Sequence, residues 1–233
     1  MKPVFVIGNG MSRMQFDIRK LKEYGRVIGC NALYRDLVPD ILVAVDEPMI
    51  NEIIDVGVHR QCCFVIEDTD KNEKYRIMPS VNTVVTNIPG LMDSGTLALL
   101  LATKYTDEVY MIGFDYTSNQ GKFNNVYAGT VNYKRKDEPH VRDVTEQSWY
   151  YRHLIIMLRH TNVEFYRVNN NNYKTPLKEY NFQNISPELF HEKYPVYNNQ
   201  IPIELVTLPI VPRVKGQRKG TPGRINHSTI RKK

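Results

Sequence analysis

Short apolar runs that recur between helix-like segments constrain the fold of this chain more than any other feature. Most of these runs contain no polar residue, as expected of strands that are buried on both faces of a sheet. They cover residues 4–7, 27–30, 41–45, 62–66, 108–112 and 163–168, with a weaker edge strand at 83–86. Helical spacing or a helix start marks residues 16–24, 49–56, 94–105 and 142–160. This alternation predicts an α/β fold: a Rossmann-like, mostly parallel sheet with helices on both faces.

The length of the chain suits one domain with a substantial core, since it has 233 residues, of which 42% are hydrophobic. We predict a single domain over residues 1–210 and a flexible basic tail over residues 211–233. Several asparagines and prolines after Asn169 predict an irregular C-terminal region between the last strand and the tail.

The predicted tail makes the chain basic. It contains eight Lys or Arg residues and no Asp or Glu, within a chain whose net charge is +6. Such a segment is typical of contacts with a polyanion, and a solvated tail that aids solubility is the alternative. DNA is favoured over a membrane surface, because the tail has no Trp, Phe or Leu to insert into lipid. The candidate contacts are Arg213, Lys215, Arg218, Lys219 and Arg224.

The sequence also bears on the compartment. It has no apolar run long enough to span a membrane and no pattern typical of a signal peptide. Its three cysteines lack the spacing of metal ligands and are expected to be reduced. We therefore predict a cytoplasmic protein, in the host cytoplasm if the chain is viral.

A glycine turn follows the first predicted strand, where residues 8–10 read Gly-Asn-Gly and Ser12 comes soon after. A strand, a glycine turn and a helix can bring backbone N–H groups to a phosphate, although a structural turn without a ligand is the alternative. A dinucleotide fingerprint would have a further glycine at Arg13 and a carboxylate at the end of the second strand, which instead ends in Asn31. These departures disfavour NAD or FAD.

Polar residues recur where the predicted strands end. Asn9, Asn31, Asp46 with Glu47, and Asp115 each follow a strand, and Ser94 with Gly95 begins a helix, with Ser94 as the expected N-cap. In parallel sheets ligands bind beyond the carboxyl ends of the strands. These residues therefore predict a nucleotide pocket, and the alternative for each is a turn or cap residue. Paired acids after a strand can hold a divalent ion, which is an alternative for Asp46 and Glu47, but adjacent acids at a strand end point to opposite sides and at most one would be a ligand, so we predict no metal site.

The order of these motifs resembles that of the bacterial lipooligosaccharide sialyltransferases and their wider relatives. The resembling motifs lie between residues 3 and 168 and are Gly8-Asn9-Gly10-Met11-Ser12, Cys30-Asn31, Asp93-Ser94-Gly95 and Gly113-Phe114-Asp115, followed by a loop with tyrosines and a histidine. The resemblance implies an inverting, metal-independent glycosyltransferase. No cofactor is implied beyond the nucleotide sugar, which is a co-substrate.

The resemblance also implies roles for individual residues. His140 would remove the proton of the acceptor hydroxyl, since imidazole titrates near neutral pH. Tyr116 and Tyr127 would donate hydrogen bonds to the leaving phosphate. The donor would be bound by the glycine turn and the polar strand ends, namely Gly8, Asn9, Gly10, Ser12, Asn31, Asp46, Glu47, Ser94, Gly95 and Asp115.

Two departures from the family pattern bear on the substrates. Leu91 stands where the family has an arginine, and Glu47 stands where it has an asparagine before Pro48. An acidic residue suits a neutral sugar better than sialic acid. For the acceptor, the basic tail favours a hydroxymethylated base in DNA, as in a phage-type DNA-modifying enzyme, over a cell-surface glycan. A non-catalytic nucleotide-binding or interaction protein is the alternative.

Overall fold

The computed structural model describes residues 2–86, 92–117, 122–123, 125–133, 141–142, 144–145, 148–174 and 181–197. Its centre is an eight-stranded sheet in which every pair of neighbouring strands is parallel. The strands are β1 (Val4–Ile7), β2 (Arg26–Cys30), β3 (Ile41–Val43), β4 (Cys63–Glu67), β5 (Val81–Val84), β6 (Glu108–Ile112), β9 (Glu164–Val168) and β10 (Phe182–Ile185). The predicted parallel sheet is confirmed.

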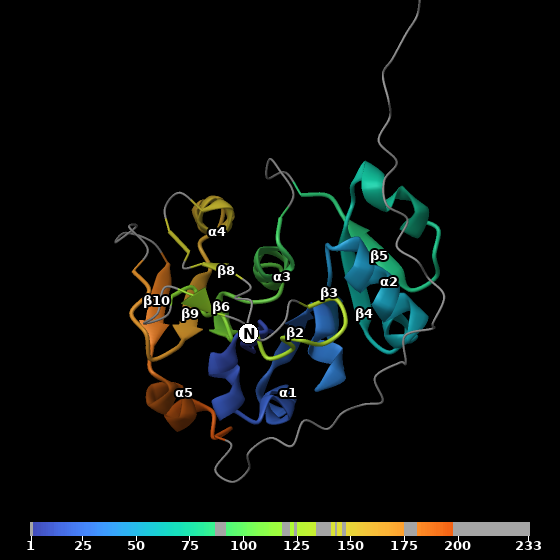
Figure 1. Ribbon diagram of the computed structural model, residues 1–233. Coiled ribbons are helices and arrows are strands. Elements are labelled where there is room, and N and C mark those ends of the chain that lie inside the picture. The colour runs from blue at the N-terminus through green and yellow to red at the C-terminus, as the bar shows by residue number, and fades with distance from the viewer. Residues whose placement is uncertain are drawn as a thin grey trace, which may run out of the picture.

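The strand order, β10-β9-β6-β1-β2-β3-β4-β5, reverses direction at β1. The chain first builds outward from β1 to the edge strand β5, and then continues on the other side with β6, β9 and β10 (Figure 1). In open parallel sheets this switch point, here between β1 and β6, leaves a crevice beyond the carboxyl ends of the strands.

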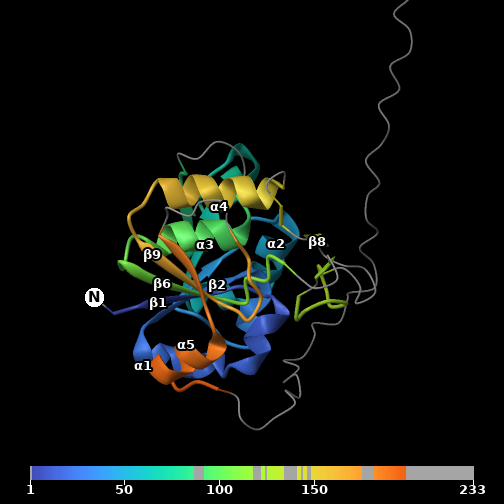
Figure 2. The same ribbon diagram turned by 90° about the vertical axis from the view of Figure 1, so that its left-hand side faces the viewer.

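Helices cover both faces of the sheet, as predicted (Figures 1 and 2). One face carries α3 (Ser94–Ala102) and α4 (Trp149–Arg159), and the other carries α1 (Leu21–Tyr24), α2 (Glu47–Asp55) and α5 (Pro187–Lys193). Short 3-10 turns complete several connections, at η1 (Met11–Gln15), η2 (Ile18–Lys20), η3 (Asn31–Arg35), η4 (Val58–Arg60) and η5 (Asp70–Tyr75). The helix predicted over residues 16–24 is only η2 followed by the single turn of α1.

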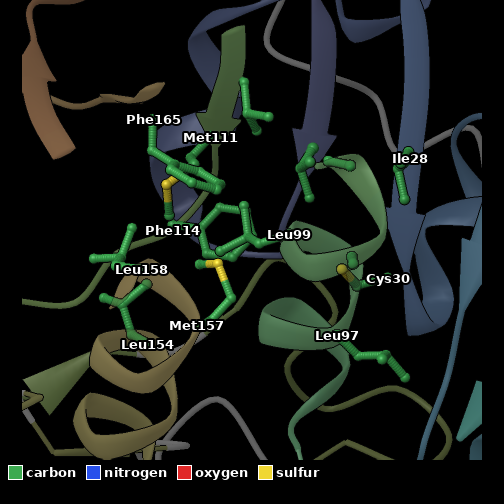
Figure 3. Close-up of a cluster of buried hydrophobic side chains, with 14 of the residues drawn as sticks. Ile28, Cys30, Leu97, Leu99, Met111, Phe114, Leu154, Met157, Leu158 and Phe165 are labelled. Atoms are coloured by element: carbon green, nitrogen blue, oxygen red, sulfur yellow. The ribbon is translucent and has the colours of Figure 1, made fainter. Parts of the chain in front are cut away.

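α3 is apolar on nearly all sides because it lies between the sheet and α4. Figure 3 shows Leu97 directed toward β2 and Leu99 directed toward the opposite side, where it meets Phe114 and α4. Both leucines are fully buried. α4 buries a single face, with Leu154 and Leu158 fully buried and Trp149 at its start 44% exposed.

The C-terminal part of the domain contains two regular elements that the sequence analysis did not predict. β10 pairs with β9 and extends the sheet by one strand. α5 begins at Pro187, with Ser186 as its N-cap, and buries Phe190 against Phe5 and Phe16. Both elements are short, so their hydrophobic periodicity is too brief to be recognised among the asparagines and prolines around them.

The segment predicted as a long polar loop, residues 116–140, contains further structure. β7 (Lys122–Phe123) pairs antiparallel with β8 (Val141–Arg142), and residues 125–133 are described in full. Leu91, His140 and the predicted tail lie outside the described residues. Within the described part of the chain, no helix is long and apolar enough to cross a membrane.

Candidate functional site

The glycine turn after β1 packs tightly against the end of β6. The Gly10 N–H donates to the Gly113 carbonyl at 2.8 Å. A Cβ added at Gly8 would lie 2.6 Å from the same carbonyl oxygen, and Gly113 itself has a left-handed φ of 76°. The two glycines were predicted to admit a ligand. What the structure shows is that Gly8 admits the backbone that follows β6, which no side chain at residue 8 would allow.

Asp115 acts as a connector between three segments. Its Oδ2 accepts from the Ser12 N–H at 3.0 Å, where η1 begins, and its Oδ1 accepts from Asn169 Nδ2 at 2.8 Å. A Cβ at Gly10 would lie 2.5 Å from Asp115 Oδ2, so this glycine makes room for the carboxylate. Asp115 therefore joins the turn after β1 to the turn after β9.

Three predicted binding residues meet beyond β1, β2 and β3. Ser94 Oγ donates to Asn31 Oδ1 at 2.8 Å and accepts from the Val45 N–H at 3.1 Å. Asn9 Nδ2 donates to the Cys30 carbonyl at 3.0 Å. Asn31 has a left-handed φ of 52°, a conformation that costs most non-glycine residues about 1 kcal/mol and that asparagine adopts more readily than they do.

Asn9 Oδ1 is the exception in this otherwise satisfied cluster. This atom is buried and accepts no hydrogen bond from the described residues. A buried acceptor without a donor costs free energy, and such groups in native proteins usually mark a place for a water, an ion or a ligand. The carboxyl ends of β1 and β2 therefore offer a hydrogen-bond acceptor that a ligand could use.

The start of α3 differs from the prediction in one detail. The N-cap is Asp93, not Ser94: its Oδ1 accepts from the Thr96 N–H at 2.9 Å and its Oδ2 accepts from Thr96 Oγ1 at 2.6 Å. Burial raises the pKa of Asp93 above its usual value, although the hydrogen bonds from Thr96 act in the opposite direction. Gly95 packs beside Phe114, since a Cβ there would lie 3.1 Å from the ring.

Residues 125–133 pass over the carboxyl ends of β1 and β2 (yellow-green in Figure 2). The Val126 N–H donates to the Asn9 carbonyl at 2.9 Å. At the end of this segment, Tyr133 Oη accepts from Asn9 Nδ2 at 3.5 Å and from the Ala32 N–H at 3.4 Å. Burial raises the pKa of Tyr133. The sequence analysis did not single out Tyr133, and its only signal was its place in the tyrosine-containing loop.

Tyr127 is buried and bonded to other residues of the protein rather than accessible to a ligand. Its ring is buried, and its hydroxyl donates to Asp36 Oδ2 at 2.7 Å and accepts from Arg13 Nη2 at 2.8 Å. Arg13 and Asp36 also form an ion pair. Burial raises the pKa of Tyr127. The hydroxyl that was predicted to contact a leaving phosphate is thus bonded to Arg13 and Asp36.

Tyr116 lies at the end of β6 beside a buried arginine that the sequence analysis missed. The Arg167 guanidinium is 5.5 Å from the Tyr116 ring, and its Nε donates to the Phe114 carbonyl at 2.6 Å. Its Nη2 donates to Asn171 Oδ1 at 2.6 Å. Burial lowers the pKa of Arg167 to about 10. Arg167 supports the 114–116 segment from β9, and burial raises the pKa of Tyr116 well above its usual value.

The remaining predicted residues are less closely joined to this cluster. Asp46 and Glu47 are exposed at the start of α2, and Glu47 forms an ion pair with Lys74. Ser12 Oγ is buried with no partner among the described residues. In the same part of the chain, no group of three His, Cys, Asp or Glu side chains could hold a metal ion. The predicted base, His140, and the tail residues Arg213, Lys215, Arg218, Lys219 and Arg224 lie outside the described residues.

Comparison with known proteins finds similarity at the level of structure only. No family model matches the chain, and no curated protein matches its sequence. The sialyltransferase CST-II in complex with a trisaccharide acceptor and CMP is 14% identical, and the match covers 83% of this chain and 99% of that one with a TM-score of 0.45.

Two further structures come from Campylobacter jejuni. Sialyltransferase CstII in complex with CMP-3FNeuAc is 17% identical, with coverage of 72% of this chain and 80% of that one and a TM-score of 0.42. An apo α-2,3-sialyltransferase is 14% identical, with coverage of 72% and 75% and a TM-score of 0.41.

Proposed function

We propose that this protein is an inverting, metal-independent glycosyltransferase that uses a nucleotide-sugar donor. The observation that carries the proposal is the cluster of Asn9, Asn31 and Ser94 at the carboxyl ends of β1 and β2 and the start of α3. The Ser94–Asn31 hydrogen bond of 2.8 Å joins motifs that are 63 residues apart in the chain. This is the place where a parallel sheet binds nucleotides.

The cluster supplies the interactions that such a donor requires. Asn9 Oδ1 can accept from a hydroxyl or amino group of the nucleotide, and Asn31, whose side-chain oxygen accepts from Ser94, keeps its amide nitrogen to donate. The N-terminus of α3 carries the positive end of the helix dipole, which favours a phosphate, and one N–H of its first turn, that of Thr96, is already bonded to Asp93. Hydrogen-bond donors directed at the leaving phosphate stabilise its developing charge without a metal.

The proposed reaction is a single displacement. An acceptor hydroxyl oxygen attacks the anomeric carbon, its proton passes to His140, and the bond between that carbon and the phosphate oxygen breaks with its electron pair leaving on the nucleotide. Inversion follows from attack on the face opposite the leaving group. Tyr116 remains our candidate for a donor to the leaving phosphate, and we assign Tyr127 to support of the loop because Arg13 and Asp36 occupy its hydroxyl.

The substrates are proposed from the sequence. Glu47 and Leu91 replace family residues in a way that favours a neutral sugar. For the acceptor we propose a hydroxymethylated base in DNA, supported by the eight basic residues between 211 and 233. A cell-surface glycan is the second candidate, supported by the resemblance of the motifs.

A thermal-shift screen against CMP-, UDP- and GDP-sugars, with and without EDTA, tests the donor. Ligand that binds only the folded protein raises the melting temperature by mass action. We expect a rise with one nucleotide class that persists in EDTA. A cooperative melt that no nucleotide shifts would contradict the proposal, and a shift that EDTA abolishes would contradict metal independence.

Catalysis is tested separately with His140→Ala. We expect transfer to fall by about 100-fold or more, within the range of general acid–base catalysis, while the nucleotide-induced shift is retained. Acceptor assays compare DNA that contains hydroxymethylcytosine with an oligosaccharide. Nucleotide binding without transfer to either, in the unsubstituted protein, would favour a non-catalytic nucleotide-binding protein.

A further inference from the structure

The segment of residues 125–133 is firmly held along most of its length. Near its start, Val126 donates to the Asn9 carbonyl at 2.9 Å, and the Tyr127 hydroxyl is bonded to Arg13 and Asp36 at 2.8 and 2.7 Å. These are hydrogen bonds of ordinary length, and two of them involve charged groups. The first part of the segment is therefore anchored to the turns after β1 and β2.

Arg35 anchors the middle of the segment. Its Nη1 donates to Thr130 Oγ1 at 2.7 Å and its Nη2 donates to the Val131 carbonyl at 3.2 Å. Arg35 is paired with Glu52, whose Oε2 also accepts from Asn132 Nδ2 at 2.6 Å. One ion pair between η3 and α2 thus fixes three consecutive residues of the segment.

Tyr133 comes directly after these anchors, and its contacts are different. The two hydrogen bonds that its hydroxyl accepts are 3.5 and 3.4 Å long, at the upper limit for such bonds. The long bonds concern the hydroxyl and not the whole residue, since the Tyr133 N–H donates to the Thr130 carbonyl at 3.1 Å and its ring centroid lies 5.6 Å from that of Tyr127 and 5.8 Å from the Arg35 guanidinium.

The two groups that donate to Tyr133 belong to the candidate site. They are Asn9 Nδ2 and the Ala32 N–H, which lie at the ends of β1 and β2. The oxygen of the same amide, Asn9 Oδ1, is buried with no partner among the described residues. The Tyr133 hydroxyl thus accepts from two donors at the site, whereas the neighbouring acceptor, Asn9 Oδ1, has no hydrogen bond from the described residues.

We propose that Tyr133 is a displaceable latch, whose hydroxyl holds the donors Asn9 Nδ2 and Ala32 N–H until a ligand replaces it. The inference rests on the proposed function in one respect, that the ligand is a nucleotide. The group that replaces the tyrosine is an oxygen or ring nitrogen that accepts both hydrogen bonds, next to a hydroxyl or amino group that donates to Asn9 Oδ1. Such neighbouring acceptors and donors occur on a nucleobase edge and on ribose.

The latch competes with the ligand, so removing its hydroxyl strengthens binding. Tyr133→Phe keeps the ring but frees both donors in the unliganded protein. In the natural protein a ligand must first displace the two hydrogen bonds to the Tyr133 hydroxyl. Tyr133→Phe lacks these bonds, so its apparent Kd for the ligand is lower. The bonds are long, so we expect Tyr133→Phe to bind CMP or UDP about three- to ten-fold more tightly than the natural protein by calorimetry.

Tyr127→Phe is the matched control, since it makes the same chemical change six residues earlier in the same segment. Its hydroxyl bonds Arg13 and Asp36 rather than the two site donors. We expect this variant to melt at a lower temperature and to show no gain in affinity. Equal or weaker nucleotide binding by Tyr133→Phe would overturn the latch, as would an equal gain in both variants.

Amide hydrogen exchange tests the latch without a ligand. The Ala32 N–H is protected by Tyr133 and should exchange faster in Tyr133→Phe by NMR, with no such change in Tyr127→Phe. Unchanged Ala32 exchange would refute the latch. If no nucleotide binds any of the three proteins while Ala32 exchange accelerates, the latch stands and the proposed function fails.

Discussion

At the scale of single residues, the side chains of the site form hydrogen bonds with one another and with the backbone rather than with solvent. Ser94 shows this clearly: it is 4% exposed, and its hydroxyl links Asn31 to the backbone after β3. Its part in the site is to orient Asn31, whose backbone is held in the left-handed region. Sequence patterns place both residues at element ends, but only their contact gives them a shared role.

Asn31→Gly separates the side chain of Asn31 from its backbone conformation. Glycine adopts the φ of 52° without strain, which offsets the lost hydrogen bond to Ser94, so we expect stability to change by less than about 1 kcal/mol. Nucleotide affinity should fall about ten-fold or more. Ser80→Gly is the control, since Ser80 also has a left-handed φ, of 64°, outside the candidate site. Equal affinities in both variants would show that Asn31 does not bind the ligand.

Asp93→Asn tests the ionisation of the α3 cap. Burial raises the folded-state pKa of Asp93, so the unfolded chain loses this proton at lower pH than the folded protein does. The carboxyl thus contributes stability that is complete below the unfolded pKa, near the usual 3.8, and is lost as pH rises through the folded pKa. Asparagine caps helices equally well and does not ionise.

We therefore expect the stability of Asp93→Asn, relative to the natural protein, to increase between pH 4 and pH 7. Urea unfolding at several pH values measures the difference. A constant difference across that range would show that Asp93 has the same pKa in both states.

At the scale of elements, the C-terminal helix completes one face of the core. α5 is only seven residues long, too short to be stable alone, and it depends on the aromatic cluster beneath it. Phe190 meets Phe5 and Tyr110 of the central strands, with ring centroids 6.1 and 5.4 Å away. The sheet face below β1 and β6 would be exposed without this helix.

Phe190→Ala should therefore lower the free energy of unfolding by about 3–5 kcal/mol, as for other buried phenylalanines. Leu189→Ala is the matched control in the same turn, because Leu189 is 55% exposed and its truncation should change stability by less than about 0.5 kcal/mol. Urea denaturation gives both values. A small effect of Phe190→Ala would mean that α5 is not part of the cooperative fold.

At the scale of the whole molecule, charge is distributed unevenly along the chain. The net charge is +6, yet without the eight basic residues of 211–233 the acidic side chains outnumber the basic ones. Attraction to DNA would therefore come from the tail, whereas the described site is lined by neutral amides and hydroxyls, by paired charges and by the buried Arg167. Removal of the tail can therefore separate binding of the DNA acceptor from binding of the nucleotide-sugar donor.

Removing residues 211–233 should reduce DNA affinity and flatten its dependence on salt, because fewer counterions are released on binding. The nucleotide-induced thermal shift should be unchanged. Titration of labelled DNA at several salt concentrations, with the full and truncated chains, measures the first effect. Equal salt slopes for the two chains would remove the support for a DNA acceptor.

The sequence by itself determined the parallel sheet, the helices on both faces and the strand ends at which polar residues gather. A strand that is buried on both faces needs consecutive apolar residues. Such a run involves neighbouring residues only, so it can be recognised in the sequence. Short elements such as β10 and α5 escaped prediction, because their stability comes from β9 and the aromatic core rather than from their own residues.

Only the tertiary structure decided which side chains meet at the site. Tyr133 reaches Asn9 and Ala32 across 124 and 101 residues of sequence, and Arg167 reaches the Phe114 carbonyl across 53. Such contacts depend on the strand order and on the path of the segment over the sheet, neither of which hydrophobic periodicity encodes. A pattern can place a polar residue at the end of a strand, but its partner depends on how distant segments pack.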